Sequence, residues 1–371
     1  MSIRSIIAKT RIGMRDRLLR FANEDLVRIA RVRQANKVFK RNLPYLKPLQ
    51  PEQEQEILNF WAPYRKIDKK ELRWFAFYNA NCDDKSQLKY YVPDIIFHSE
   101  IDLHFTAARR CDDLDDKNLY DLFFHGVKMP RTVVRKINGE FLDEDYQIIT
   151  LDQAVKLCFE AGQVVYKEAR LSLGGHGVHF YDLSGNDAVQ ELRSRLTKED
   201  NINVQRVINQ HECLNNIHRN SINTVRIMSL MLDGKVHLLS SVLRMGRDGS
   251  RVDNACSGGI VCGINEDGTL KEFAYNTRGA HWDKHPQGLT FKGYKIVGYD
   301  KCCELVKTLA GRLSTATQLV SWDLAVGEDG EPVLIEANFT WGEIDFHQLC
   351  NGPILGDLTQ EVLSRVYHKS K

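Results

Sequence analysis

Long apolar runs are missing from this sequence, and their absence excludes several classes of protein. No stretch approaches the ~18 consecutive apolar residues of a membrane-spanning helix, and the start lacks the unbroken apolar core of a secretory signal. Internal repeats and low-complexity tracts are also absent, which excludes repeat architectures. We therefore expect a protein that works in the cytoplasm.

The cysteines show no pattern either. All 9 are scattered along the chain, and no two of them form a CxxC pair. A structural zinc site needs closely spaced pairs, and a disulfide framework needs an even, patterned set. The sequence therefore favours reduced thiols over disulfides or zinc.

The composition is that of an ordinary globular protein. With 371 residues, 43% of them hydrophobic and 27% charged, the chain can bury a substantial core in two or three domains or subdomains. Its net charge of +2 hides an asymmetry, because residues 1–48 contain 13 Lys/Arg and 3 Asp/Glu. That segment therefore carries +10, and the remaining chain carries −8.

The basic N-terminal segment, residues 1–50, has the apolar spacing of helices with one apolar stripe and one basic face. Such a helix most often packs against its own protein and leaves the basic face in solvent. Binding to an anionic membrane surface is the main alternative, so peripheral membrane contact through residues 1–48 stays open. We expect no nucleic acid partner, because the segment lacks a binding module and interleaved aromatic residues.

Helices and strands follow one another in mixed order along the rest of the chain, which indicates an α+β fold. Residues 51–111 look helical and aromatic, and we expect them to form an accessory domain. Two further subdomains are expected, residues 112–204 with a glycine-rich loop and residues 205–371 with a cluster of acidic side chains.

Local signals place one helix and one hairpin within these subdomains. Thr150 or Asp152 can cap a helix that continues to Ala161 and ends at Gly162. A long hairpin is expected to turn at Asp233-Gly234, because such a pair suits a two-residue turn with positive φ.

The stretch "SWDLAVGEDGEPVLIEANF", from Ser321, predicts a second hairpin around Asp329-Gly330. A two-residue turn there sets Asp323 directly opposite Glu336, and Asn338 shares their face because side chains alternate along a strand. Two carboxylates and an amide oxygen on one face suit Mg²⁺. The alternative is a solvated polar face whose acids pair by accident.

A glycine-rich loop follows a lysine at the end of an apolar strand. Lys167 is followed by Gly174, Gly175, His176 and Gly177, a loop whose backbone amides can approach a phosphate closely. The loop does not fit GxxxxGK[ST], so it is no Walker P-loop. A glycine-rich hairpin tip without any ligand explains it as well, but together with Lys117 it is typical of a flexible lid over polyphosphate.

The order of these and other segments resembles the ATP-grasp superfamily of ligases, and within it the group associated with sugar transfer. The likeness covers roughly residues 112–345. It is carried by "DDKNLYDLFFHGVKMPRT", "VVYKEARLSLGGHGVHF", "VQRVI", "NTVRIMSLMLDG", "VLRMGRDGSRVDNACSGGI" and "SWDLAVGEDGEPVLIEANF". The resemblance implies an ATP-grasp fold, in which two α+β subdomains clamp ATP, with a helical, basic N-terminal region added here.

The resemblance also implies roles for individual residues. Lys117 and Lys167 would bind phosphate beside the glycine loop, and Glu212 would bind ribose, with His211 nearly as good a candidate. Adenine would meet a hinge formed by Gln205, Arg206, Val207 and Ile208. Catalytic roles near the γ-phosphate or the acyl group would go to Arg226, Arg244 and Asn254, the last followed by Gly258-Gly259. Asp323, Glu336 and Asn338 would hold one or two Mg²⁺ ions.

Two features depart from the family pattern. A two-residue turn at Asp233-Gly234 places Arg226 and Arg244 on opposite faces of the sheet, so that both reach one site only if a bulge intervenes. The acidic residue usual at the start of the hinge is Gln205 here, whose amide oxygen can still accept a hydrogen bond from the adenine amine.

The implied activity is that of an ATP- and Mg²⁺-dependent ligase that joins a carboxylate to an amine through an acyl phosphate. Its small-molecule partners are expected to be an amino acid and a sugar derivative, in the biosynthesis of a surface polysaccharide or sugar conjugate. One alternative is an ATP-grasp kinase that phosphorylates a hydroxyl group. Another is a nucleotide-binding scaffold at the membrane. His281 and His285 are weaker candidates for substrate contact, because surface histidines more often have no assigned role.

Overall fold

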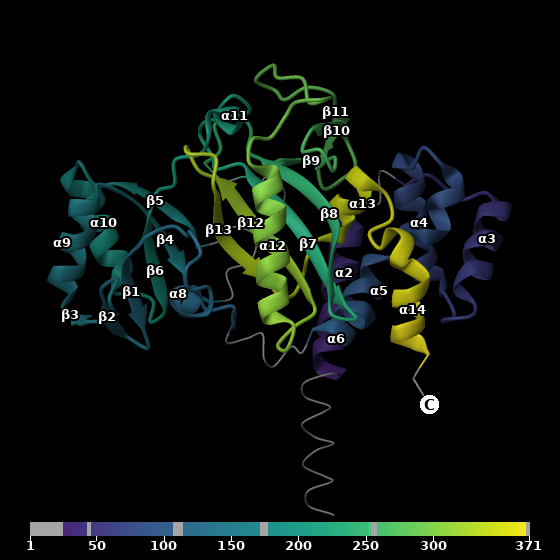
Figure 1. The fold of residues 1–371 in the computed structure, drawn as a ribbon, viewed down its shortest axis with the longest axis horizontal. Coiled ribbons are helices and arrows are strands. Elements are labelled where there is room, and N and C mark those ends of the chain that lie inside the picture. The colour runs from purple at the N-terminus through teal and green to yellow at the C-terminus, as the bar shows by residue number, and fades with distance from the viewer. Residues whose placement is uncertain are drawn as a thin grey trace, which may run out of the picture. The chain divides into compact units, whose positions relative to one another are not determined.

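The computed structural model describes residues 25–42, 46–106, 114–170, 177–251, 253 and 258–368. The chain forms two compact units, one of residues up to 111 together with those from 340 onward, and one of Asp112–Phe339 (Figure 1). From the sequence we expect residues 340–371 in the C-terminal subdomain, whereas they pack in the N-terminal unit. One physical reason is Gln348, which donates to Val92 O at 2.8 Å and accepts from Val92 N at 2.9 Å.

The N-terminal unit is built from helices. Its longer helices begin at recognisable signals: Asp68 accepts hydrogen bonds from the backbone of Lys70 and Glu71 and so caps α4. Its core is aromatic, with Trp61, Trp74 and Phe75 fully buried. The helices are α2 (Leu26–Asn42), α3 (Pro51–Trp61), α4 (Lys69–Asn81), α5 (Asp94–Ile96), α6 (Asp102–Phe105), α13 (Ile344–Asn351) and α14 (Thr359–Tyr367), with 3₁₀ helices Lys85–Tyr90 and Gly356–Leu358 and the π-helical turn Phe97–Ile101.

Helix α2 is the described part of the basic segment. It buries Arg31, Ala35 and Phe39, and Arg31 pairs with Asp102 at 2.9 Å, so this helix packs against its own unit. Leu26 and Ile29 stay 47% and 44% exposed. In the part of the chain that the structure describes, no helix is long and apolar enough to cross a membrane.

The second unit contains two antiparallel sheets. The first has six strands in the order β3-β2-β1-β6-β4-β5, and helices α9 (Leu151–Ala161) and α10 (Asn186–Leu196) pack on it. Thr150 caps α9 and Gly162, with φ of 77°, ends it, as the sequence predicts. The strands are β1 (Thr132–Ile137), β2 (Glu140–Leu142), β3 (Ile148–Ile149), β4 (Gln163–Glu168), β5 (His179–Asp182) and β6 (Ile202–Arg206).

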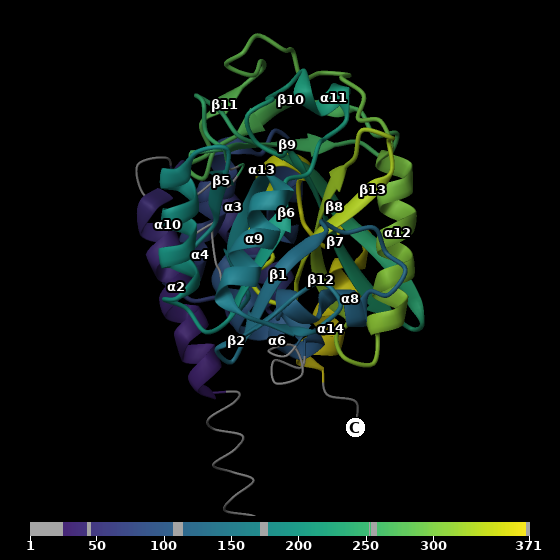
Figure 2. The same ribbon diagram turned by 90° about the vertical axis from the view of Figure 1, so that its left-hand side faces the viewer.

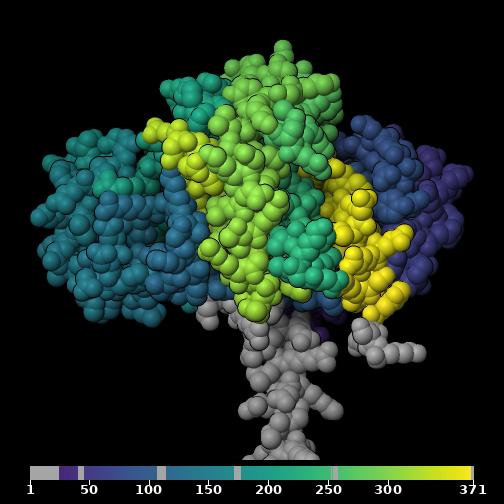
Figure 3. Space-filling model, in the orientation of Figure 1, coloured from purple at the N-terminus to yellow at the C-terminus, as the bar shows by residue number. Residues whose placement is uncertain are grey.

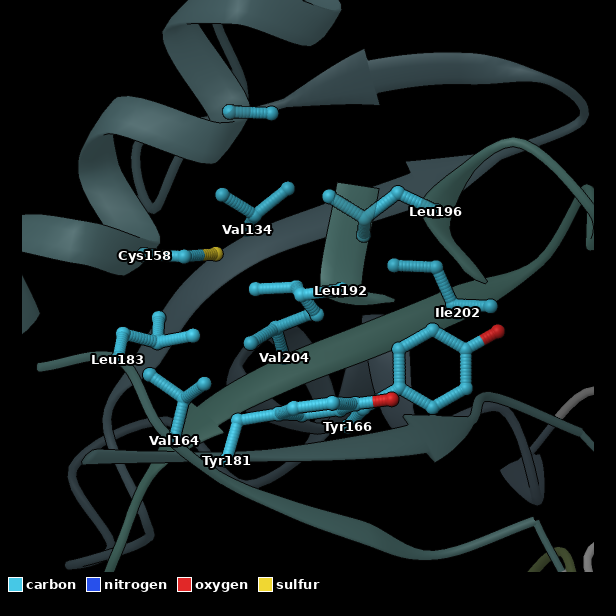
Figure 4. Packing of buried hydrophobic residues seen from close by; sticks show 11 residues of the cluster. Val134, Cys158, Val164, Tyr166, Tyr181, Leu183, Leu192, Leu196, Ile202 and Val204 are labelled. Carbon is cyan, nitrogen blue, oxygen red and sulfur yellow. The ribbon is translucent and has the colours of Figure 1, made fainter. Parts of the chain in front are cut away.

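The two faces of this first sheet differ in character. On the helix side, apolar side chains pack into one core, which includes Val134, Val164, Tyr166 and Val204 together with Leu192 (Figure 4). Residues that alternate with these along β4 and β6 point to the other face. That second face carries the polar side chains Lys167, Asn203 and Gln205 as well as Val165.

The second sheet has seven strands in the order β11-β10-β9-β8-β7-β12-β13. Helix α12 (Tyr299–Leu313) packs along β7, β8 and β12, and its outer side is open on the surface (Figures 2 and 3). The strands are β7 (Thr224–Leu232), β8 (Lys235–Met245), β9 (Ile260–Ile264), β10 (Leu270–Tyr275), β11 (His281–Trp282), β12 (Leu319–Val326) and β13 (Pro332–Asn338), and short helices α8 (Tyr120–Phe123) and α11 (Glu212–Asn215) complete the unit. The mixed helices and sheets confirm the predicted α+β class.

The hairpin of β7 and β8 contains the bulge on which the placement of the two arginines depends. Asp233 and Gly234 form the predicted two-residue turn, with φ of 47° and 77°. Met228 then pairs with Ser240 and Ser229 with Leu238, so Leu239 is an extra residue on β8. Thr224 therefore stands opposite Arg244, and the face of Arg226 is also the face of Arg244.

The hairpin of β12 and β13 has the predicted pairing of Asp323 with Glu336, but its turn differs from the expected one. Gly327 N donates to Glu331 O at 2.9 Å, so the loop has three residues, 328–330, and not the expected two. This shifts the pairing by one residue, but a second irregularity at Ile335 shifts it back. Asp323 therefore lies directly opposite Glu336.

Candidate active site

The acidic face of β12 lies between arginines and a lysine. Asp323 is only 3% exposed and stands opposite Arg226 on the neighbouring strand β7. The Nε and Nη2 atoms of Arg226 each lie 2.7 Å from one carboxylate oxygen of Asp323. Arg244 on β8 adds a third contact, from Nη1 to Asp323 Oδ2 at 3.0 Å. Asn338 Nδ2 lies 3.4 Å from the same oxygen, which places Asn338 on the predicted face.

These cations fix the charge of Asp323. Burial alone would raise its pKa, but Arg226 and Arg244 outweigh that effect and hold the pKa at about 2. Asp323 is therefore ionised throughout the physiological pH range. Its two oxygens are the best hydrogen-bonded acceptors among the predicted metal ligands.

Glu336 faces the predicted phosphate lysines. Lys117 Nζ lies 2.7 Å from Glu336 Oε1, and this lysine is 7% exposed. Burial lowers the pKa of Lys117, but Glu336 more than compensates, so the net shift is upward. Burial also lowers the pKa of Lys167, to about 8, against the opposing charge of Glu336.

The segment of Lys117 connects the two sheets of the second unit. Lys117 begins a 3₁₀ helix, Lys117–Leu119, and its backbone N donates to Ala169 O at 2.9 Å beyond β4. Asn118 receives a hydrogen bond from Asn203 Nδ2 on β6 at 3.0 Å. The lysine is thus anchored to the first sheet while its ammonium group pairs with an acid of the second.

Tyr120 holds the same segment against β13 and was not identified from the sequence. Its hydroxyl donates to Ala337 O and accepts from Ala337 N, both at 3.3 Å. Since β13 is the edge strand, this hydroxyl occupies an edge that would otherwise lack a partner strand. Ala337 lies between Glu336 and Asn338, so Tyr120 fixes the backbone of both. Nothing in the local sequence around Tyr120 indicates such a long-range contact.

The predicted hinge borders a cavity. Beyond β6, Val207 and Ile208 help to line a cavity of about 580 Å³, a volume within the range of small-molecule sites. The same cavity is lined by Gln163, Phe180, Asn209, Gln210, Asn215, Arg219, Asn220, Ser221, Ile222, Gly249, Arg251 and Glu328. The predicted metal ligands and the two predicted phosphate lysines do not line this cavity.

Gln205 and Arg206, the first two residues of the predicted hinge, differ in their surroundings. Gln205 is 8% exposed, and its Oε1 is buried without a hydrogen-bond partner among the described residues. An acceptor of this kind suits the amine of adenine. Arg206 is exposed, and its side chain lies 3.5 Å from Ala161 O on the helix side of the sheet.

The two ribose candidates differ in their contacts. Glu212 Oε1 pairs with Arg219, a residue of the cavity wall, at 3.1 Å. His211 caps α11, and its Nδ1 accepts from Cys213 N at 3.1 Å. Nδ1 of His211 is thus engaged, and so are both carboxylate oxygens of the exposed Glu212, because Asn215 Nδ2 donates to its Oε2 at 3.2 Å. Assignment of ribose to Glu212 stays a prediction.

Four of the predicted site residues lie outside the described part of the chain, namely Gly174, Gly175, His176 and Asn254. Gly177 is described, with φ of 76°, and a Cβ there would meet Glu168 Oε1 at 2.8 Å, so the position requires glycine. Of the two candidate histidines, His285 is buried and bonds Gly246 O at 2.9 Å, a structural contact.

Asp253 is a third acid near the arginines that was not identified from the sequence. Its Oδ1 lies 3.7 Å from Arg244 Nη2. Burial raises its pKa, and Arg244 opposes that shift. Across the described ranges, no group of three or more His, Cys, Asp or Glu side chains is arranged to hold a metal ion. The predicted metal set therefore depends on two carboxylates and one amide.

A model of a known protein family matches most of the chain. The model of the sugar-transfer associated ATP-grasp family matches residues 103–364. No curated protein sequence matches the chain.

Solved structures resemble it at low identity. D-alanyl-alanine synthetase A from Vibrio cholerae is 11% identical with a TM-score of 0.42, covering 71% of this chain and 68% of its own. D-cycloserine synthetase is 15% identical with a TM-score of 0.40, covering 67% and 70%. An L-amino acid ligase from Bacillus licheniformis is 16% identical with a TM-score of 0.35, covering 67% and 49%. Family membership depends on the family model and not on these likenesses.

Proposed function

Because this chain belongs to the sugar-transfer associated ATP-grasp family, we propose that it is an ATP- and Mg²⁺-dependent ligase that joins a carboxylate to an amine. The observation that carries the proposal is the pairing of Lys117 with Glu336 and of two arginines with Asp323. Lys117, whose segment is anchored to the first sheet, thus meets an acid of the second sheet that lies opposite the arginine-bound Asp323.

The charges near Asp323 and Glu336 favour a polyphosphate. Four cationic side chains, Lys117, Lys167, Arg226 and Arg244, gather around the acids Asp323, Glu336 and Asp253. Cations gathered at one place favour the binding of an anion. The phosphates of ATP supply that anion, and the orphaned Gln205 Oε1 supplies an acceptor for its base.

The donor set fits Mg²⁺, which prefers carboxylate and amide oxygens. Asp323, Glu336 and Asn338 share one face of the β12–β13 hairpin, and one or two ions bound there would compete with Arg226 and Arg244 for Asp323 and with Lys117 for Glu336. When bound, the metal neutralises charge on the transferring phosphoryl oxygens. The proposed Mg²⁺ site uses no histidine or cysteine of this chain as a ligand.

The proposed chemistry needs no nucleophile from the protein. A carboxylate oxygen of the substrate attacks the γ-phosphorus, the bond from that phosphorus to the bridging oxygen breaks, and ADP leaves. The amine of the second substrate then attacks the acyl carbon, loses a proton, and displaces phosphate. Lys117 and Lys167 would neutralise the phosphoryl oxygens, and Arg226 and Arg244 would orient the acyl group.

The substrates are proposed by class. The family description associates these proteins with sugar transfer, so we propose an amino acid and a sugar derivative as partners, in surface polysaccharide or sugar-conjugate biosynthesis. Cytoplasmic location and peripheral membrane contact are also proposals. Co-sedimentation of the full chain with anionic vesicles, compared with a Leu26→Glu/Ile29→Glu variant, tests the membrane contact because these side chains lie exposed on α2.

The function is tested by ADP release in a screen of carboxylate and amine pairs with Mg²⁺. Glu336→Gln should lose at least about 100-fold in rate, since it removes a charged group at the phosphoryl centre. The matched control is Glu331→Gln, an acid of the same hairpin that pairs with Lys301 at the surface. Hydroxylamine should trap the acyl phosphate as a hydroxamate. ADP release without hydroxamate would indicate a kinase, and an unaffected Glu336→Gln would overturn the site assignment.

A further inference from the structure

Asp253 is the carboxylate near the two arginines that the proposed function leaves without a role. Its Oδ2 accepts a hydrogen bond from Thr224 Oγ1 and another from Thr224 N at 3.3 Å. Thr224 begins β7 and stands directly opposite Arg244 on β8. The side chain of Asp253 is only 15% exposed, so this carboxylate is fixed at the end of the strand pair.

Arg244 lies between two carboxylates. Its Nη1 is 3.0 Å from Asp323 Oδ2, and its Nη2 is 3.7 Å from Asp253 Oδ1. Asp323 also accepts two hydrogen bonds from Arg226. Any cation that binds Asp323 therefore competes with both guanidinium groups.

We propose that Asp253 is a positioning residue that retains Arg244 in the site while Asp323 binds Mg²⁺. The inference rests on the proposed function, because the metal belongs to it. A guanidinium that loses Asp323 as its partner would face the metal without a compensating charge. Asp253 provides that charge, and a planar guanidinium already within 3.7 Å can turn to it without leaving the sheet.

Loss of the Asp253 charge should weaken nucleotide binding only when the metal takes part in it. If Asp253 loses its charge, Asp323 is the one acid among the described residues that still pairs with Arg244, and the metal must displace a more tightly held arginine. The Mg²⁺ concentration needed for nucleotide binding should then rise about tenfold, the order of magnitude expected when one member of a salt-bridge network is removed. Without metal, nucleotide binding should be no weaker, because the site has lost a negative charge.

The experiment is calorimetry of a non-hydrolysable ATP analogue on the full chain, titrated over a range of Mg²⁺ concentrations and again in EDTA. The test variant is Asp253→Asn, which keeps an acceptor for Thr224 but loses the charge. Asp248→Asn is the matched control, because Asp248 lies on the same segment, is 70% exposed at its side chain, and pairs with Arg247. Should Asp253→Asn fail to fold, Thr224→Val removes the hydroxyl that fixes Asp253 and should shift the Mg²⁺ dependence in the same direction.

The outcomes separate the inference from the function on which it rests. A tenfold shift in Asp253→Asn with metal, no weakening in EDTA, and an unchanged Asp248→Asn support the inference. An unchanged Mg²⁺ dependence overturns it, and so does an equal weakening with and without metal, which would indicate a structural role. Wild-type protein that binds no nucleotide at any Mg²⁺ concentration overturns the proposed function, and the inference with it.

Discussion

Asp323→Asn tests the electrostatics of the site independently of any ligand. The substitution keeps the size of the side chain but removes the charge that two buried arginines share. Arg226 is 6% exposed and Arg244 7% exposed, so neither can exchange Asp323 for water. Removing one partner of a buried ion pair costs about 3–5 kcal/mol. Asp253 still faces Arg244 at 3.7 Å, so most of the loss falls on Arg226, which donates two hydrogen bonds to Asp323.

The assay is urea unfolding in EDTA, followed by tryptophan fluorescence, since Trp322 is buried beside Asp323 on β12. With a slope of about 3 kcal/mol per molar for a chain of this size, the midpoint should fall by about 1 M or more. The matched control is Asp329→Asn, an exposed acid of the same hairpin that pairs with Lys128, and its midpoint should not move. A midpoint of Asp323→Asn equal to that of the wild type would refute the view that Asp323 neutralises the arginines.

Three further predictions follow from individual contacts. Tyr120→Phe removes the hydroxyl that bonds Ala337 N and O, so the free energy of unfolding should fall by about 1–3 kcal/mol. Tyr294→Phe, which loses one hydrogen bond to Cys213 O, should lower it less, and urea unfolding of both variants measures the difference. Lys167, with its pKa at about 8, loses its charge as pH rises through that value, so affinity for ADP should fall between about pH 7 and 9. Lys167→Arg should remove this pH dependence. A wild-type affinity that does not change over this range would contradict a phosphate-binding role for Lys167. Gln205→Leu should weaken ATP binding about tenfold by removing the buried acceptor, and calorimetry that shows equal affinity would remove Gln205 from the hinge assignment.

The sequence predicted the acidic site because its geometry is mostly local. The opposition of Asp323 and Glu336 followed from a turn signal and strand alternation. The loop proved one residue longer than expected, and the irregularity at Ile335 compensated for it. Turn lengths and bulges depend on packing around the hairpin, so the pairing was predictable while its exact construction was not.

The placement of the two arginines was also predictable from the sequence only in part. Sequence alternation alone placed Arg226 and Arg244 on opposite faces, and it named a bulge as the condition for a shared site. The extra residue Leu239 meets that condition. No propensity rule locates a bulge within an apolar strand such as β8, so only the structure brings both guanidinium groups onto Asp323.

Long-range contacts lay outside what the sequence reveals. Tyr120 and Ala337 are 217 residues apart, and Asp253 contacts Arg244 from an irregular segment. The helices after residue 343 have amphipathic patterns that show a buried face but do not say which partner covers it, and this is why they were placed in the wrong unit. Patterns of alternation and capping predict elements, whereas partners across the fold come from tertiary packing.

The most direct test of the account is calorimetry of a non-hydrolysable ATP analogue on wild-type protein and on Glu336→Gln, with and without Mg²⁺. The account predicts one nucleotide bound per chain by the wild type, tighter with Mg²⁺, and a loss of the metal-dependent part in Glu336→Gln but not in Glu331→Gln. Wild-type protein that binds no nucleotide, or a Glu336→Gln variant with the same metal dependence as the wild type, would contradict it.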